Sequence, residues 1–340
     1  MSETKGQITP DVTFVIAAYN AADTIMRAIE SALAQVGVAV EVVVIDDCSA
    51  DATATLVAAI RDPRVRLIAL EQNRGPGGAR NAGLAAARGK WIAILDSDDT
   101  VTPDRLKRMI DRAETAQAQI VVDNLDVLSR GGKSTRMFSE AALAALHELT
   151  LAVFIESNEI FRSEHNFGYM KPVFERRFIE AHGLRFDEEL RIGEDYLLLA
   201  SALACGGRCA VEPLAGYIYH IREGSISRVL RLEHIDAMVA ADDRFLARYT
   251  LDPLSHRMQS KRRRGFQQAR SFLMLVEHLK NRSLAGALKT ALADPFALRH
   301  LRMPIAARLR RLLAPPTNSA SMMEAAERSP LGKDPHTSKG

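Results

Sequence analysis

An α/β fold with a mainly parallel central sheet flanked by helices is predicted from three observations on this chain of 340 residues. Short apolar segments alternate with amphipathic ones over the first hundred residues. The apolar segments are almost uninterrupted, which is typical of strands buried on both faces of a parallel sheet. Two of them end in carboxylates, and ligands of open α/β sheets bind beyond the carboxyl ends of the strands.

The N-terminal elements follow one another at regular intervals. We expect buried strands at residues 12–18, 41–45, 65–70 and 91–95. We expect helices between them at about 23–35, 49–60 and 79–87. The first of these has apolar residues at helical spacing, and Gly75-Pro76-Gly77-Gly78 is predicted to be the turn that leads into the third.

The middle of the chain is less regular. Helices are expected at about 141–146, 171–182 and 195–204, and a strand at 215–220. From about residue 255 the chain is predicted to be helical and is strongly basic, since its many Lys and Arg residues face only Glu277 and Asp294 up to residue 314. The composition, 47% apolar and 26% charged, is ordinary for a soluble globular protein.

The most informative motif is the acidic run that follows the strand at 91–95. It contains Asp96, Asp98 and Asp99. Three carboxylates at the exit of a buried strand repel one another, and burial adds the cost of removing them from water. A cation among them would compensate for both costs. Mg²⁺ and Mn²⁺ prefer oxygen ligands and bind through one or two carboxylates plus substrate phosphates. The alternative is a solvated acidic turn that caps the helix after Pro103.

The sequence lacks the common phosphate-binding motifs. Neither G-x-G-x-x-G nor G-x-x-x-x-G-K-[ST] occurs at a strand exit. Instead, Tyr19 follows the first strand and Asp47 the second. An aromatic face can stack on a base, and a carboxylate can accept hydrogen bonds from uracil or ribose. Arg80 could meet a phosphate or pair with the acidic run, so these groups indicate a pocket for a nucleoside diphosphate and its metal.

Four ordered motifs resemble those of family 2 glycosyltransferases with the GT-A fold, which transfer sugars from nucleotide-diphospho-sugars. They lie within residues 10–228 and read Val-x-x-Val-Ile-Ala-Ala-Tyr-Asn, Ile-Asp-Asp-Cys-Ser-x-Asp-Ala-Thr, Asn-Arg-Gly-x-x-x-Ala-Arg-Asn-x-Gly and Leu-Asp-Ser-Asp-Asp. The chain resembles most the bacterial exopolysaccharide glucosyltransferases of succinoglycan assembly. The resemblance implies a UDP-sugar donor. It assigns the uridine contacts to Ala17, Tyr19 and Asp47, the ribose and sugar to Asp96, and Mn²⁺ or Mg²⁺ to Asp98 and Asp99.

The resemblance also implies a general base on an acidic pair in the second half, where Glu194-Asp195 fits. An inverting transfer needs one base for the proton of the acceptor hydroxyl. Asp195 is the first candidate and Glu194 the second, although the pair could simply cap a helix. Related sequences often carry Tyr-Arg-x-His where this chain has His220-Ile221-Arg222. We therefore expect Arg222 to contact the diphosphate, since a guanidinium pairs with phosphate, and His220 could be a packed strand residue.

The same resemblance suggests how the chain is divided. We expect a GT-A domain at 10–245, with a nucleotide-sugar half at 10–125 and an acceptor and base half at 126–245. A basic helical extension at 246–314 and a disordered tail at 315–340 follow. Phe167 and Tyr169 lie where the family places its acceptor side, where they could stack on a sugar or belong to the core.

Charge and hydropathy indicate the location and partners. The sequence shows no secretory segment and no apolar run long enough to span a bilayer, so we expect a cytoplasmic protein. The basic extension could be a solvated face, a nucleic-acid surface or a contact with an anionic membrane. No nucleic-acid motif supports the second interpretation. A lipid-linked oligosaccharide acceptor favours the third, with the enzyme peripheral on the inner face of the cytoplasmic membrane.

The resemblance therefore implies an inverting, metal-dependent transfer of a hexose, with glucose as the first candidate. Two alternatives remain open from the residues. One is a nucleotidyltransferase of sugar phosphates, although such enzymes usually carry a Gly-rich loop where this chain has Ala17-Ala18-Tyr19-Asn20. The other is a catalytically degenerate, membrane-associated assembly subunit. The oligomeric state is not predicted.

Overall fold

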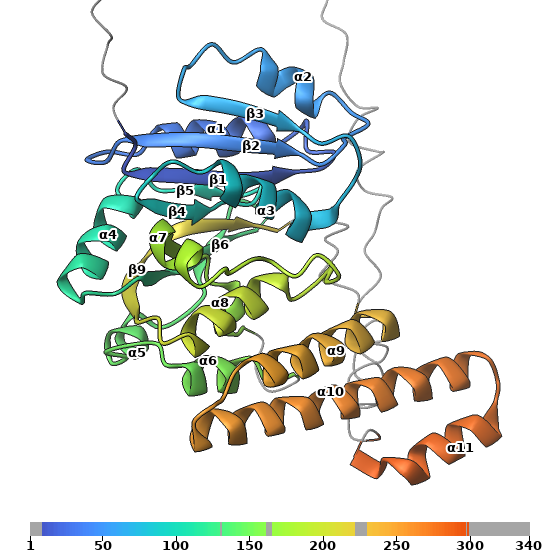
Figure 1. Ribbon diagram of the computed structural model, residues 1–340. Coiled ribbons are helices and arrows are strands. Elements are labelled where there is room, and N and C mark those ends of the chain that lie inside the picture. The colour runs from blue at the N-terminus through green and yellow to red at the C-terminus, as the bar shows by residue number, and fades with distance from the viewer. Residues whose placement is uncertain (1–8, 130, 161–164, 222–229, 297, 299–340) are drawn as a thin grey trace, which may run out of the picture.

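A mixed β-sheet covered by helices forms the body of the molecule, and three further helices form a layer at one end (Figure 1). The computed structural model describes residues 9–129, 131–160, 165–221, 230–296 and 298. The predicted tail at 315–340 lies outside these residues.

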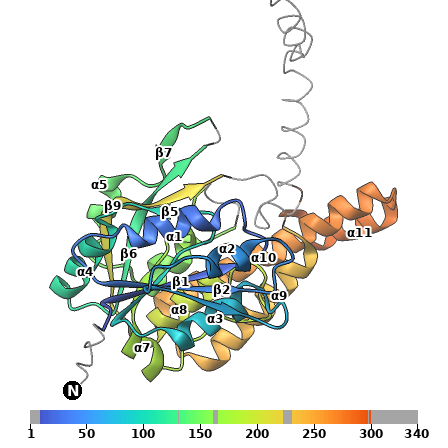
Figure 2. The same ribbon diagram turned by 90° about the horizontal axis from the view of Figure 1, so that it is seen from above.

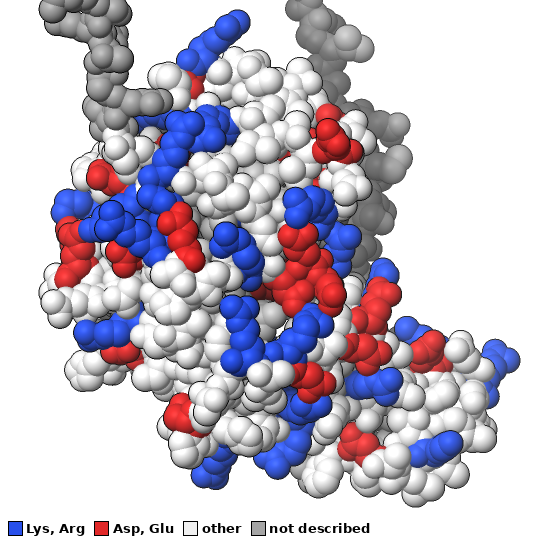
Figure 3. Space-filling model, in the orientation of Figure 1, with Lys and Arg blue, Asp and Glu red and all other residues white. Residues whose placement is uncertain are grey.

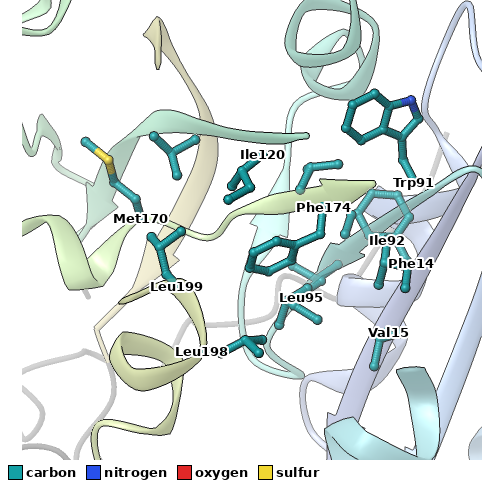
Figure 4. Close-up of a cluster of buried hydrophobic side chains, with 14 of the residues drawn as sticks. Phe14, Val15, Trp91, Ile92, Leu95, Ile120, Met170, Phe174, Leu198 and Leu199 are labelled. Atoms are coloured by element: carbon teal, nitrogen blue, oxygen red, sulfur yellow. The ribbon is translucent and has the colours of Figure 1, made fainter. Parts of the chain in front are cut away.

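Parallel strands form the first half of the sheet, as predicted. They are β1 (Val12–Ala18), β2 (Val40–Asp46), β3 (Val65–Ala69) and β4 (Trp91–Ile94), in the spatial order β3-β2-β1-β4. The crossover helices are α1 (Ile25–Leu33), α2 (Thr53–Ala58) and α3 (Gly75–Ala86). Figure 4 shows part of the core, in which side chains of β1 and β4 such as Phe14 and Ile92 pack near Phe174 and Leu199 from the second half. Burial on both faces explains why these strands are apolar throughout.

The glycine-rich segment before the third helix was predicted to be a turn, and this was wrong. Residues 75–78 form the first turn of α3, because a proline is well tolerated at the start of a helix. The glycines allow close packing. A Cβ at Gly77 would lie 2.8 Å from the carbonyl oxygen of Asp187, and one at Gly83 would lie 2.3 Å from Cγ1 of Val15. Helix α3 therefore lies tightly between β1 and a loop of the second half.

The second half extends the same sheet with strands of both directions. They are β5 (Thr100–Val101), β6 (Ile120–Leu128), β7 (Ser134–Arg136), β8 (Val173–Glu175) and β9 (Cys209–His220). Strand β8 lies antiparallel between β4 and β6, whereas β9 is parallel to β6 and carries β5 at its far edge. The sheet is therefore parallel in its first half and mixed beyond β4.

Strand β8 corrects another prediction. Residues 171–182 were expected to form one helix, but only α7 (Arg176–Ala181) is helical. Val173 and Phe174 are fully buried between two strands, and this pairing outweighs local helix preference. Lys171 also precedes a proline, which favours an extended backbone there. The remaining helices of the body are α4 (Arg105–Thr115), α5 (Glu140–Ala144), α6 (Leu151–Ser157), the 3₁₀ turn η1 (Phe167–Tyr169) and α8 (Glu194–Ala204).

Three helices form the C-terminal layer: α9 (Leu232–Arg248), α10 (Pro253–Lys280) and α11 (Leu284–Ala293). Helix α10 lies against α6 and α9, and α9 runs without interruption past residue 245. A buried contact joins this layer to the body. Arg262 of α10 pairs with Asp242 of α9 at 2.5 and 2.7 Å, and its guanidinium lies 3.7 Å from the ring centroid of Tyr196 on α8.

The positive charge of this layer is partly neutralised within the protein. Three cations of α10 pair with carboxylates of α9: Arg262 with Asp242, Arg263 with Asp243, and Arg270 with Asp236. Two further cations of the layer pair with carboxylates of the body: Lys261 with Glu159, and Arg244 with Asp187 and Glu189. Figure 3 accordingly shows blue and red side chains interspersed on the visible face rather than one basic patch. No helix among the described residues is both long and apolar enough to cross a bilayer.

Helix α11 presents an exposed apolar ridge. Leu284, Leu288 and Leu292 recur every four residues and are 62–76% exposed, while Ala287 is buried against the protein. The helix projects from the rest of the molecule when viewed from above (Figure 2). In Figure 1 it lies on the side toward which β2 and β3 point. Helix α11 and the carboxyl ends of these strands therefore lie toward the same side of the molecule.

Candidate active site

The residues predicted to hold the nucleotide lie at the carboxyl ends of β1 and β2. Ala17 is half-buried near the end of β1, and Tyr19 follows it with 55% of its surface exposed. The aromatic face of Tyr19 is thus free to stack on a ring. Asp47 is buried, and its carboxylate accepts the backbone N–H groups of Arg74 at 2.7 Å and Gly75 at 2.8 Å. Asp47 therefore fixes the start of α3, a role that the sequence did not suggest.

The acidic run lies where β4 ends. Asp99 is buried and accepts the hydroxyl of Tyr217 at 2.8 Å and the backbone N–H of His220 at 2.8 Å. Burial, together with the negative charges of Asp96 and Asp98, raises the pKa of Asp99. Asp98 is half-buried, and its backbone carbonyl accepts a hydrogen bond from Arg27. The strand exit therefore concentrates negative charge, as the sequence predicted.

These carboxylates could supply some of the oxygen ligands of a hard divalent cation. Among the described residues, no three His, Cys, Asp or Glu side chains converge as a complete metal cage. Mg²⁺ and Mn²⁺ do not need one, because one or two carboxylates plus diphosphate oxygens and water suffice. The half-buried Asp98 suits a direct ligand. Asp99, held through both of its oxygens, suits a supporting position or a second ligand.

Arg80 joins three carboxylates, one that follows β4 and two at the start of α8. Its guanidinium lies 2.7 Å from Asp96, 2.6 Å from Glu194 and 3.1 Å from Asp195. The side chain is only 8% exposed and passes 5.4 Å from the ring centroid of Phe186. Of the two roles that the sequence left open for Arg80, the structure shows pairing with the acidic residues.

Lys171 completes this cluster, and sequence reasoning did not single it out. Its Nζ lies 2.8 Å from Oδ2 of Asp96 and 2.6 Å from Oδ2 of Asp195. Burial opposes ionisation of Asp96, but the positive charges of Lys171 and Arg80 outweigh it and lower the pKa of Asp96. We name the five residues Arg80, Asp96, Lys171, Glu194 and Asp195 the central ion cluster.

The two candidate bases differ in their access to solvent. The side chain of Asp195 is 21% exposed, whereas that of Glu194 is 9% exposed. Both lie in the first turn of α8, where carboxylates are favoured by the helix dipole. Burial and the neighbouring charge of Asp195 raise the pKa of Glu194. Asp195 is therefore the more accessible carboxylate, and Glu194 mainly pairs with Arg80.

The remaining predicted residues are His220, Arg222, Phe167 and Tyr169. The ring of His220, at the end of β9, is 3.0 Å from the hydroxyl of Thr100. Arg222 lies outside the described residues. Phe167 and Tyr169 are half-buried in η1, where Phe167 packs edge-on against Phe138 and Tyr169 lies near Tyr219.

Comparisons with known proteins agree with this geometry. The family model described as "Glycosyl transferase family 2" matches residues 13–178. "Succinoglycan biosynthesis protein ExoO" of Rhizobium meliloti (strain 1021) is 76% identical over 97% of each chain. The chain belongs to glycosyltransferase family 2. "Succinoglycan biosynthesis protein ExoU" of the same strain is 36% identical over 85% of this chain and 84% of its own length.

A solved structure confirms the predicted fold of this family 2 glycosyltransferase. The crystal structure of S. aureus TarS 1-349 in complex with UDP-GlcNAc superposes with a TM-score of 0.60 at 18% identity. The match covers 82% of this chain and 90% of the other. The GT-A fold is thus confirmed, and the family match argues against a nucleotidyltransferase of sugar phosphates.

Proposed function

We propose that this glycosyltransferase transfers a hexose, with glucose as the first candidate, from a UDP-sugar to a lipid-linked oligosaccharide. The reaction inverts the anomeric centre and belongs to exopolysaccharide assembly of the succinoglycan type. The observation that carries the proposal is the position of Asp195. This accessible carboxylate of the second half is held within the same ion cluster as Asp96, which follows the donor-side strand β4.

The donor is held by residues at the carboxyl ends of the first strands. Tyr19 stacks on the uracil, and Ala17 and Asp47 border the uridine. Asp98, supported by Asp99, would hold Mn²⁺ or Mg²⁺. The cation, when bound, neutralises the negative charge of the UDP leaving group. Arg222 adds a diphosphate contact in this proposal, since a guanidinium matches phosphate geometry.

Asp195 is the general base. It takes the proton of an acceptor hydroxyl while that oxygen bonds to the anomeric carbon and the bond from this carbon to the UDP oxygen breaks. Oδ2 of Asp195 accepts a hydrogen bond from Lys171 and Oδ1 forms an ion pair with Arg80, which leaves lone pairs for the acceptor hydroxyl. No covalent sugar intermediate is required. Glu194 is less suited to this role because Arg80 and burial occupy it.

The acceptor is presented from a membrane surface, and α11 makes the contact. Its exposed ridge of Leu284, Leu288 and Leu292 is flanked by exposed Lys280 and Lys289. Apolar side chains bordered by cations are typical of helices that lie in an anionic interface. In α10, by contrast, Leu275 is buried within the protein. The ridge therefore suits the inner leaflet of the cytoplasmic membrane better than α10 does.

The decisive experiment measures UDP release. The full chain is given UDP-glucose or UDP-galactose with Mn²⁺ and a lipid extract from membranes of an exopolysaccharide-producing strain, and the product linkage is determined by NMR. We expect release that depends on the extract and an inverted anomeric configuration. Asp195→Asn should retain UDP binding and lose roughly 100-fold or more in kcat. Retained configuration, or an active Asp195→Asn variant, would contradict the proposal.

A further inference from the structure

Lys171 occupies a position that links the two halves of the proposed active site. Its side chain is 10% exposed, and it lies between a carboxylate that follows β4 and one that opens α8. Its Nζ forms an ion pair with Asp96 at 2.8 Å and donates a charge-assisted hydrogen bond of 2.6 Å to Asp195. Lys171 thus contacts the predicted donor side and the proposed base at once.

The backbone of Lys171 is itself fixed. Its carbonyl oxygen accepts a hydrogen bond of 2.8 Å from Arg105, whose guanidinium forms a fully buried pair with Asp123. Pro172 follows, and β8 then pairs on both sides. The ammonium group is therefore positioned from a rigid element, as groups at functional sites require.

The two cations of the cluster contact different oxygens of Asp195. Arg80 contacts Oδ1 at 3.1 Å, and Lys171 contacts Oδ2 at 2.6 Å. Together they fix the plane of the carboxylate. Arg80 also holds Glu194, whereas the contacts of Lys171 go to Asp96 and Asp195 alone among the ion pairs of the described residues. Lys171 is therefore the more specific partner of the base.

Charge balance indicates the same role. Two cations face three carboxylates in the cluster, so loss of Lys171 would leave Arg80 alone against all three. Burial opposes the charged form of Lys171, but the attraction of Asp195 and Asp96 outweighs it and raises the pKa of Lys171. Buried ion pairs add little net stability compared with apolar packing, so stability alone does not account for a lysine at this position.

We propose that Lys171 is a positioning residue that holds the Asp195 carboxylate in register with the donor sugar by tying it to Asp96. The inference rests on the proposed function, because it assumes that Asp195 takes the acceptor proton. Lys171 acts through Asp195, and Arg80 still holds Asp96 when Lys171 is removed, so its removal should affect turnover and leave UDP binding unchanged. A correctly held base contributes roughly 100-fold or more to the rate.

The test combines Lys171→Met with Asp195→Asn in the full chain. Turnover is followed by UDP release from UDP-glucose with the membrane lipid extract, and UDP affinity by calorimetry with Mn²⁺. We expect Lys171→Met to lower kcat by roughly 100-fold with UDP affinity kept within about 2-fold. In the Asp195→Asn background the same change should lower kcat by less than about 3-fold, because the two residues act as one unit.

Matched variants complete the design. Lys107→Met removes an exposed lysine of α4 that pairs with Asp111, and it should leave kcat unchanged. If Lys171→Met does not fold, Lys171→Gln is used in its place. The glutamine keeps N–H donors near both carboxylates but carries no charge. Failure of both to fold shows a structural role and overturns the proposal.

The remaining outcomes separate this proposal from the function on which it rests. A wild-type chain that releases no UDP from either UDP-hexose overturns both. With an active wild type, unchanged kcat in Lys171→Met, or losses that simply add to those of Asp195→Asn, overturn the role of Lys171 alone.

Discussion

Removing one partner of the contact between Arg262 and Asp242 should destabilise the body as well as the C-terminal layer. Both side chains are nearly inaccessible, and the pair joins α10 to α9. The guanidinium also covers the ring of Tyr196, the residue that follows the proposed base. Arg262→Met would leave the Asp242 carboxylate buried without its cation.

The expected magnitude follows from this burial. Removing one partner of a buried ion pair costs about 3–5 kcal/mol, because the remaining charge is desolvated and uncompensated. For a domain of this size, each kcal/mol lowers Tm by about 2–4 °C, so we expect a decrease on the order of 10 °C. Replacing both partners should cost far less. Arg262 Nε already lacks a hydrogen-bond partner among the described residues, so the native pair is imperfectly satisfied.

The assay is urea unfolding of the full chain, followed by far-UV circular dichroism and by the fluorescence of Trp91. We expect Arg262→Met to lower the free energy of unfolding by about 3–5 kcal/mol. The double variant Arg262→Met/Asp242→Leu should recover most of that loss. A single variant within about 1 kcal/mol of wild type, or a double variant as unstable as the single one, would refute the reasoning.

Three further predictions concern the metal, the pH dependence and the packing of α3. Asp98→Asn should weaken Mn²⁺-dependent UDP binding with the fold intact, and unchanged affinity in calorimetry would contradict the metal assignment. Burial and the charge of Asp195 raise the pKa of Glu194 on folding, so the folded state holds this proton more tightly than the unfolded state does. The contribution of Glu194 to stability is therefore lost as the pH rises from the ordinary Glu pKa through the raised pKa. Glu194→Gln should remove that contribution, and urea midpoints of both proteins from pH 4 to 8 check it; a wild-type-minus-variant difference that does not fall with pH would count against it. Gly83→Ala should lower the free energy of unfolding by about 1–3 kcal/mol, because its Cβ would meet Val15 and Ile45. Gly265→Ala in α10, whose Cβ would meet nothing closer than 3.9 Å, should raise it by about 0.5–1 kcal/mol. Equal effects in urea unfolding would contradict the packing argument.

The first half of the sheet could be predicted because its strands are buried on both faces. A short, uninterrupted apolar run such as residues 42–45 is typical of strands in that position. Strand β8 could not be predicted, because its three residues adjoin a helix and gain their conformation from partners distant in sequence, on β4 and β6. Strand β6 and helix α9 were not predicted either.

The site shows a similar division. Asp96, Glu194 and Asp195 were found because acidic runs beside apolar segments are conspicuous and because four motifs indicated a family. Lys171 was missed because a lysine before a proline carries no local signal. Only the folded chain brings its ammonium between Asp96 and Asp195. Charge balance was the available clue, since three clustered and partly buried carboxylates require more than one cation.

The insertion of β8 between β4 and β6 has a consequence for synthesis of the chain. Strand β4 is made long before β8, so the nascent N-terminal part has an unpaired apolar edge until residues 173–175 leave the ribosome. Such an edge is a template for pairing with other chains. Slow, non-local pairing prolongs this exposure. Expression fragments that end near residue 125 should therefore aggregate rather than form an independent nucleotide-binding module, and fragments for structural work need to include β8 and the strands on either side of it.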